Sequence, residues 1–369
     1  MPTLIFKETE ACNSNCIYCD VIARKKPRTI KKDLLRRVFI CINEYLEQYP
    51  QEYFSIVWHG GEPCIVGAEF YEHVLDLENE VCSNTKNRIE HDIQTNLTLI
   101  NQHMIDVFKR MGITRVGTSY EPYKGIRGFG ENRDSDAYNK KFFKGIELIE
   151  KNGFSWGFIY VVTRRVIDKP LEIFNILTNF KVRGGFQLHP VYSYKNEDPN
   201  GVGITAKEFA VFLGEIFKVW WDKRELYPYV EPFFSYLNHY GKGGPVCCSD
   251  SGNCAYSHIY IGPEGELSHC GRASDWDVFE VGNIQEMNII DAFKSLYRQQ
   301  LAMRSEYLQQ ADCKGCEYFK ICHGGCPLDG WNSTGSIMSK TEWCLSRRYF
   351  LKNYFEPITG LKFNGTKYE

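Results

Sequence analysis

The chain has 369 residues, of which 43% are hydrophobic and 15% aromatic, so it can form a large apolar core and more than one domain. Its 44 basic and 46 acidic residues give a formal net charge of −2 without long runs of one sign, a pattern that indicates neither nucleic-acid binding nor binding to an anionic membrane. No stretch approaches the roughly 18 apolar residues of a membrane-spanning helix, and the N-terminus carries no export signal. We therefore expect a cytoplasmic protein.

Strand-like and helix-like segments alternate along the first two thirds of the chain. The predicted strands are Thr3–Lys7, Phe54–Trp58, Ile89–Gln94, Arg115–Ser119, Gly157–Val162 and Gly185–Val191. The predicted helices are Lys31–Gln48, Ala68–Val81, Gln102–Arg110, Asp136–Glu150, Pro170–Asn179 and Thr205–Trp221. This order is typical of an α/β fold with a parallel sheet or barrel, whose active site lies at the carboxyl ends of the strands.

The 15 cysteines gather towards both ends of the chain. In a long chain without an export signal, such clusters favour reduced thiols that bind metal over disulfides. Cysteine density rises after residue 245, which predicts a core domain over 1–225, a linker over 226–245 and a cysteine-rich domain over 246–369.

The first cysteine motif follows the first predicted strand directly. Cys12, Cys16 and Cys19 have the spacing CX3CX2C. Three thiolates can hold three irons of a 4Fe-4S cluster and leave the fourth iron open for another ligand. An incomplete zinc site is the alternative interpretation.

The second motif, Trp58-His59-Gly60-Gly61-Glu62-Pro63, ends the second predicted strand. Its glycines allow the backbone to approach a ligand closely, and the Glu62 carboxylate can accept a hydrogen bond from an ammonium group. A plain turn at the end of a strand is the alternative.

The C-terminal cysteines form a third group. Its members are Cys254, Cys270, Cys313, Cys316, Cys322, Cys326 and Cys344. Together with Cys248 or its neighbour Cys247 they supply enough thiolates for two complete clusters, although a zinc ribbon would use similar pairs. Of the remaining cysteines, Cys41 and Cys82 are expected to be inert core residues. Cys64 is expected to have a packing role, with a position facing the active site as the alternative.

The first two motifs closely resemble those of the radical S-adenosylmethionine (SAM) superfamily. The resemblance implies that Cys12, Cys16 and Cys19 bind the radical-generating cluster. It also implies that SAM contacts Tyr18, Gly61, Glu62, Ser119, Arg133 and Leu188. After Ser119 the chain reads Tyr120-Glu121-Pro122, where relatives have Asp-Gly, so the following loop differs from theirs.

The C-terminal group resembles the SPASM domain, which typically holds two auxiliary 4Fe-4S clusters. By this resemblance we assign Cys248, Cys254, Cys270 and Cys326 to the first auxiliary cluster. Cys313, Cys316, Cys322 and Cys344 are assigned to the second. The implied fold is a partial (β/α)6 TIM-type barrel followed by a SPASM domain, and the implied cofactors are three 4Fe-4S clusters and SAM.

The implied activity is reductive cleavage of SAM to a 5′-deoxyadenosyl radical that abstracts hydrogen from a substrate. A peptide modified by crosslinking, thioether formation or epimerisation is the favoured substrate. Sulfatase maturation ranks lower, because the maturases have a basic Asp after the cysteine equivalent to Cys270, where this chain has Gly271. Asp275, Asp277, His269 and Glu121 are read as solvated residues, so no catalytic base is assigned.

Other functions remain open. A radical SAM dehydrogenase or epimerase would act on a small molecule, and a non-enzyme would be an electron carrier or a zinc-stabilised binding protein. The expected partner is a flavodoxin-like or ferredoxin-like reductant. Because the cluster loop begins as early as Cys12, recognition of a leader peptide would need a separate protein or the aromatic-rich segment Val219–Tyr240, unless the substrate is small and needs no leader.

Overall fold

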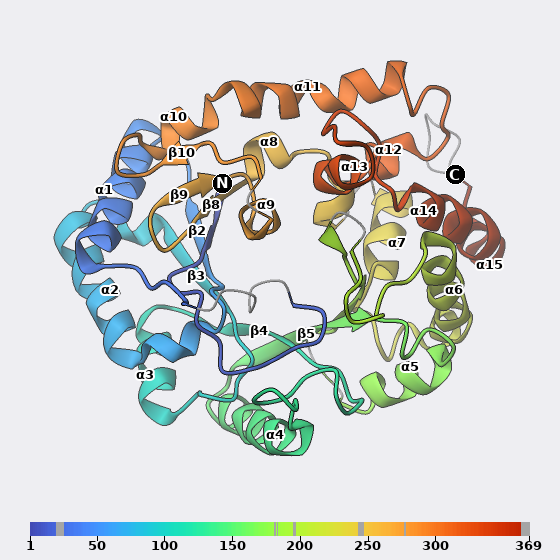
Figure 1. The fold of residues 1–369 in the computed structure, drawn as a ribbon, viewed down its shortest axis with the longest axis horizontal. Coiled ribbons are helices and arrows are strands. Elements are labelled where there is room, and N and C mark those ends of the chain that lie inside the picture. Colours follow the sequence, from blue (N-terminus) through green and yellow to red (C-terminus); the bar gives the residue numbers. More distant parts are fainter. Residues whose placement is uncertain are drawn as a thin grey trace. The chain divides into compact units, whose positions relative to one another are not determined.

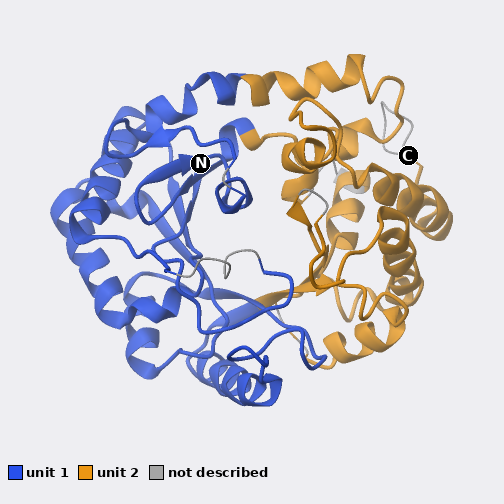
Figure 2. Ribbon diagram, in the orientation of Figure 1, with its two compact units in different colours: residues 1–156, 255–299 blue, residues 157–254, 300–369 orange. Residues whose placement is uncertain are grey.

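The computed structural model describes residues 1–19, 26–180, 182, 184–194, 197–242, 247–276 and 278–362. The chain divides into two compact units that interleave along the sequence, residues 1–156 with 255–299 and residues 157–254 with 300–369 (Figure 2). The domain boundary at 226–245 stays a prediction. Within the described residues, none of the helices combines the length and the apolar character that a membrane-spanning helix needs.

The first unit alternates strands and helices before it adds a small hairpin (Figure 1). Its first part comprises β1 (Thr3–Phe6), α1 (Lys32–Gln48), β2 (Phe54–Trp58), η2 (Pro63–Val66), α2 (Ala68–Val81), η3 (Lys86–Arg88), β3 (Ile89–Gln94), α3 (Gln102–Arg110), β4 (Arg115–Ser119) and α4 (Ser135–Lys151). Its second part comprises α8 (Cys254–Ser257), β8 (His258–Ile261), β9 (Glu266–Ser268), α9 (Gly271–Asp275), β10 (Gly282–Asn283), α10 (Ile289–Phe293) and the start of α11 (Leu296–Gln310).

Within this unit the strands form one sheet in the order β10-β9-β8-β1-β2-β3-β4. β1 pairs in parallel with β2 on one side and with β8 on the other, so that Leu4 lies between Ile56 and Ile259. All three of these side chains are fully buried. The pairing of β1 with β8 was not predicted, because it joins segments that are far apart in the sequence.

Helix α1 shows why these segments form helices. Its buried residues Leu35, Val38, Phe39, Ile42 and Leu46 recur every three or four positions, which makes one apolar face. Helix α3 begins at Asn101, whose side chain accepts a hydrogen bond from the Met104 backbone N–H, a standard N-cap. Local sequence and burial therefore favour the same structure.

The second unit contains a shorter parallel sheet and most of the C-terminal helices. Its elements are β5 (Ser155–Val162, which begins in the first unit), α5 (Pro170–Thr178), β6 (Phe186–Pro190), α6 (Ala206–Lys223), β7 (Val230–Glu231), α7 (Phe233–Lys242), η5 (Cys248–Asp250), α12 (Phe319–Cys322), α13 (Pro327–Thr334), α14 (Cys344–Phe350), the π-helix η6 (Leu351–Phe355) and α15 (Glu356–Thr359). β5, β6 and β7 run parallel in that order. The predicted α/β class and all twelve predicted strands and helices are confirmed.

Candidate active site

The loop after β1 carries Cys12, Cys16 and Cys19, whose thiols act electrostatically on one another. The Ser14 backbone N–H donates to Cys12 Sγ at 3.4 Å, and the Cys19 N–H donates to the Cys16 carbonyl at 3.1 Å. Burial, with a smaller contribution from the neighbouring thiols, raises the pKa values of Cys12 and Cys16 to about 12. Buried thiols that repel one another as thiolates suit a positively charged metal cluster, so this donor set fits an iron–sulfur cluster.

A buried polar network lies beside this loop. Tyr18 donates its hydroxyl hydrogen to Glu121 Oε1 at 2.7 Å, and Arg127 Nε donates to Glu121 Oε2 at 2.9 Å. Arg127 Nη2 also lies 2.6 Å from the Tyr18 hydroxyl oxygen. Glu121 is 3% exposed, so the expectation that it is a solvated residue is wrong. The network fixes Tyr18, the residue before Cys19.

Glu62 sits in a cradle of donors at the carboxyl end of β2. Its Oε1 accepts from Thr95 Oγ1 at 2.5 Å and from the Cys64 N–H at 2.9 Å, and its Oε2 accepts from the Asn96 N–H at 2.7 Å. Burial raises the pKa of Glu62, and these hydrogen bonds oppose that rise. The Cys64 side chain also lowers the pKa of Glu62 through a hydrogen bond, so several donors favour the charged carboxylate that a ligand ammonium group would need.

Gly61 meets a different requirement from the one expected. A Cβ atom at this position would lie 2.5 Å from the Glu10 carbonyl oxygen and 2.6 Å from that of Ala11. Its N–H donates to the Thr9 carbonyl at 2.7 Å. The missing side chain therefore allows the β2 turn to pack against the backbone that leads into Cys12, which links the two sequence motifs physically.

Two further predicted SAM contacts lie in the first unit. Ser119 ends β4, and its Oγ accepts a hydrogen bond from Gln94 Nε2 at 3.3 Å. Arg133 has a left-handed backbone with φ of 50°, and its buried Nε has no hydrogen-bond partner among the described residues. A buried guanidinium N–H without a partner can donate to an acceptor on a ligand, which fits SAM.

The other candidate bases have different surroundings. Asp275 forms an ion pair with Lys7. His269 is 1% exposed and lies 3.0 Å from the Tyr297 hydroxyl group, so it is not solvated as expected, and burial lowers its pKa to about 3. Asp277 lies outside the described residues.

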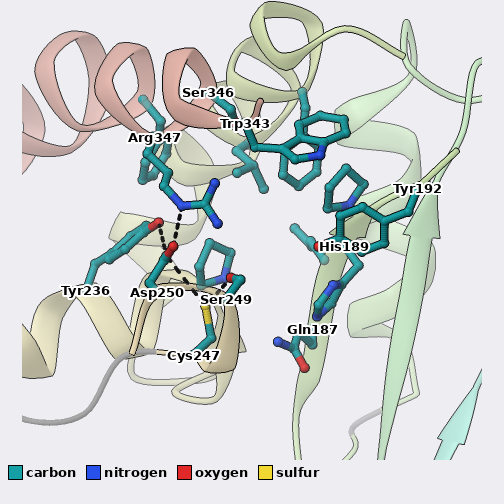
Figure 3. Close-up of a pocket in the computed structure, with 16 residues that line it drawn as sticks. Gln187, His189, Tyr192, Tyr236, Cys247, Ser249, Asp250, Trp343, Ser346 and Arg347 are labelled. Carbon is teal, nitrogen blue, oxygen red and sulfur yellow. Dashed lines mark hydrogen bonds and ion pairs between the residues drawn. The ribbon is translucent and has the colours of Figure 1, made fainter. Parts of the chain in front are cut away.

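In the second unit, Leu188 lines a cavity of about 50 Å³, which has room for a few water molecules (Figure 3). Asp250 is a polar centre of its wall: it pairs with Arg347, accepts from the Tyr236 hydroxyl group at 3.2 Å and lies 3.7 Å from Cys247 Sγ. Cys247 thus faces the cavity wall, whereas the Cys248 residue is exposed. The choice of Cys248 over Cys247 as the cluster ligand stays a prediction.

The second auxiliary set gathers within this unit. Burial, with smaller contributions from Cys344 and Cys316, raises the pKa of Cys313 to about 11. Cys344 acts in the same direction on Cys322, whose pKa burial raises to about 12. Leu308 and Phe319 pack with Cys313, and Cys316 packs against these residues. These effects connect Cys344 with Cys313 and Cys322, and Cys316 with Cys313, which agrees with the proposed donor set of one cluster.

The first auxiliary set is divided between the units. Cys254 and Cys326 both act electrostatically on the buried Arg304 in the second unit. Cys270 is the N-cap residue of α9 in the first unit. None of the 15 cysteines forms a disulfide, in agreement with the expectation of reduced thiols, and Cys41, Cys64 and Cys82 are buried as expected.

Two family models match the chain. The model of the radical SAM superfamily matches residues 8–177, and the model of the SPASM iron–sulfur cluster-binding domain matches residues 248–317. The first match contains the Cys12–Cys19 loop and the Glu62 cradle, and the second contains Cys248, Cys254 and Cys270.

The chain is also similar to characterised enzymes along its length. It is 24% identical over 381 residues to a cysteine-type anaerobic sulfatase-maturating enzyme of Clostridium perfringens, with 98% of each chain covered. It is 21% identical to a serine-type enzyme of Bacteroides thetaiotaomicron, with 88% of this chain and 81% of that enzyme covered.

Among solved structures, native anSMEcpe with bound AdoMet and the Cp18Cys peptide has the same fold. The TM-score is 0.82 at 21% identity, with 97% of this chain and 98% of that chain covered. The predicted partial barrel with a SPASM domain is thereby confirmed as the fold. From its two family matches, its cysteine loops and its fold, this chain is a radical SAM enzyme with a SPASM domain, and its cofactors are three 4Fe-4S clusters and SAM.

Proposed function

We propose that this enzyme modifies a residue within a peptide or protein substrate. The observation that carries this proposal is the similarity, over 98% of both chains, to an enzyme named for sulfatase maturation. When bound, the first cluster and SAM supply a radical that abstracts a hydrogen atom from the substrate. The chain's own residues would bind and orient these groups and exclude water from them.

In this proposal Cys12, Cys16 and Cys19 hold the first cluster. Glu62 accepts from the SAM amine, while Arg133 donates through its unpartnered Nε. The remaining SAM contacts would come from Tyr18, Gly61, Ser119 and Leu188, as the resemblance implies. Cys248, Cys254, Cys270 and Cys326 would hold one auxiliary cluster, and Cys313, Cys316, Cys322 and Cys344 the other.

Two kinds of peptide modification have specific support. The relatives' names favour oxidation of a Cys or Ser residue in a sulfatase. Gly271 favours a different modification, such as a crosslink, a thioether or epimerisation, because no proton acceptor follows Cys270 directly. Gly271 is a feature of this chain itself, whereas the other argument rests on the names of relatives. We therefore rank a crosslink, a thioether or epimerisation above oxidation of a Cys or Ser residue.

We also propose that a flavodoxin-like or ferredoxin-like protein supplies electrons and that the enzyme works in the cytoplasm. A separate protein that recognises a leader peptide would complete the system. These partners follow from the chemistry of the cofactors and from the resemblance.

The test begins with anaerobic reconstitution of the full chain and measurement of iron and 5′-deoxyadenosine. Three matched synthetic peptides with Cys, Ser or Ala at the central position, and a pool of peptides from a digested lysate, would then be incubated with the enzyme and SAM. Mass spectrometry would follow the products, with Cys16→Ala as the inactive control.

Each outcome decides between the options. Oxidation of the Cys or Ser peptide alone would establish sulfatase-type chemistry. A mass change in other peptides would support the option we place first. SAM cleavage that changes no peptide in any sample would contradict the proposal.

A further inference from the structure

Arg304, on α11, is a buried cation whose hydrogen bonds all run to neutral groups. The residue is 3% exposed. Its Nε donates to the Ile337 carbonyl at 2.5 Å, Nη1 to that of Gly325 at 2.7 Å, and Nη2 to those of Ser339 at 2.7 Å and Gly324 at 3.3 Å. Because none of these acceptors carries a formal charge, the positive charge is left to act on its surroundings.

The carbonyls of Gly324 and Gly325 place this charge beside cluster ligands. Both glycines have left-handed backbones, with φ of 82° and 74°, and lie between Cys322 and Cys326. A Cβ atom at Gly324 would be 3.7 Å from Cys313 Sγ, so this loop runs directly past that thiol. Arg304 therefore holds the backbone that joins a ligand of one auxiliary cluster to a ligand of the other.

The electrostatic surroundings agree with this geometry. Burial lowers the pKa of Arg304, and the opposing effects come from Cys326, Cys254, Cys313 and the buried carboxylate of Asp329, in that order. Two of these thiols belong to the first auxiliary set and one belongs to the second. The thiolates that would hold both clusters are thus the main partners of the buried charge.

We infer that Arg304 is a positioning residue that raises the reduction potentials of both auxiliary clusters. A reduced cluster carries one more negative charge than an oxidised one, so a fixed positive charge nearby stabilises the reduced form. Burial strengthens the effect, because little water screens the charge. The inference rests on the proposed cluster ligands.

The competing explanation is a purely structural clamp. Arg304→Lys keeps the charge but cannot span four carbonyls, whereas Arg304→Gln keeps N–H donors and loses the charge. A matched control is Arg88→Gln, because Arg88 donates to the carbonyls of Leu46, Tyr49 and Glu52 in the first unit at 2.9, 3.2 and 2.9 Å. The three variants distinguish the effect of the Arg304 charge from the effect of its hydrogen bonds to the backbone.

The experiment is a reductive titration of the reconstituted full chain, followed by electron paramagnetic resonance. It uses a background in which Cys12, Cys16 and Cys19 are replaced by alanine, so that only auxiliary clusters contribute signals. We expect more negative midpoint potentials in Arg304→Gln and a smaller change in Arg304→Lys. Arg88→Gln should lower thermal stability without moving the potentials.

Equal potentials in the wild-type, Gln and Lys forms would overturn the inference. So would equal loss of iron from the Gln and Lys variants, because that result makes Arg304 a clamp only. Loss of iron from Arg304→Gln alone would support a requirement for the charge. The ligand proposal is checked separately by iron content: the background should hold about eight irons per chain, and about twelve would contradict that proposal.

Discussion

Arg127 in the first unit and Arg304 in the second show two ways of burying a guanidinium group near cluster cysteines. Arg127 forms an ion pair with Glu121 Oε2 at 2.9 Å, so a carboxylate balances its charge. Arg304 donates to four carbonyls and has no such balance within its hydrogen bonds. Arg127 thus has a carboxylate among its hydrogen-bond partners and also acts on Cys16, whereas the hydrogen bonds of Arg304 run to neutral carbonyls, although the buried Asp329 also raises its pKa.

This difference suits two kinds of cluster. A cluster that must pass an electron to SAM is served by surroundings that do not stabilise its reduced form. Clusters that accept electrons are served by a positive charge, which does stabilise that form. The following changes test whether the two regions are as independent as this comparison assumes.

The largest effect is expected from Cys16→Ala. Removal of one of three thiols should abolish SAM cleavage and leave about eight of twelve irons, because the auxiliary ligands lie elsewhere. Iron analysis and 5′-deoxyadenosine measurement check this, with buried Cys41→Ala as the control that keeps both. Retention of about twelve irons in Cys16→Ala would contradict the assignment of Cys16 to a separate N-terminal cluster.

Cys322→Ala addresses the other side of the comparison. We expect it to lose about four irons and to reduce product formation much more than SAM cleavage, because the first cluster keeps its ligands. Chromatography of both products on one sample measures this ratio. Equal loss of both would mean that the auxiliary cluster only stabilises the fold or that it feeds electrons to the first.

Arg127→Met sharpens the contrast between the two cations. It leaves the Glu121 carboxylate buried without its charged partner, so we expect a loss of about 3–5 kcal/mol in the free energy of unfolding. Denaturant titration of the enzyme without cofactors measures it. Arg36→Met, which removes an exposed pair with Glu80, is the control and should change nothing measurable.

A second comparison concerns two buried carboxylates of the first unit. Glu62 has several donors, so Glu62→Gln should weaken SAM binding by about 10–100-fold through loss of a charged hydrogen bond. Equilibrium dialysis with reconstituted enzyme checks this, and iron content should stay unchanged. Unaltered SAM affinity would remove Glu62 from the site.

Glu8, by contrast, has no hydrogen-bond partner among the described residues for either carboxylate oxygen, and burial raises its pKa from 4.5 to about 8. The folded state therefore binds a proton that the unfolded state has released between these pH values, so this group's contribution to stability falls as pH rises through that window. Glu8→Gln should lack this decline. Unfolding curves of the wild type and of Glu8→Gln, measured at pH 5 to 9, test this. A parallel loss of stability in the two proteins would contradict the role of Glu8.

The sequence was sufficient for the strands, the helices and the two N-terminal motifs, because each depends on local periodicity and spacing. It was insufficient for the surroundings of those motifs. Glu121 looked like a solvated loop residue, and only the fold places it against Arg127, six positions further on. The partners of Glu62 were visible as polar strand-end residues, but their convergence on one carboxylate depends on the register of β2 and β3.

Arg304 gave no sequence signal, since an arginine on a helix is ordinarily a surface residue. Its role depends on the glycine loop at 324–325, which folds back onto α11. The pairing of β1 with β8 was hidden for a related reason, because contacts between distant segments leave no local pattern.

The pairing of β1 with β8 has a consequence for folding during synthesis on the ribosome. β1 is synthesised well before β8, so one of its edges stays without that partner until residues 258–261 leave the ribosome. Throughout most of synthesis the nascent chain carries an open strand edge, the kind of surface on which other chains add. A messenger RNA truncated before β8 should therefore yield chains that depend on chaperones and aggregate without them.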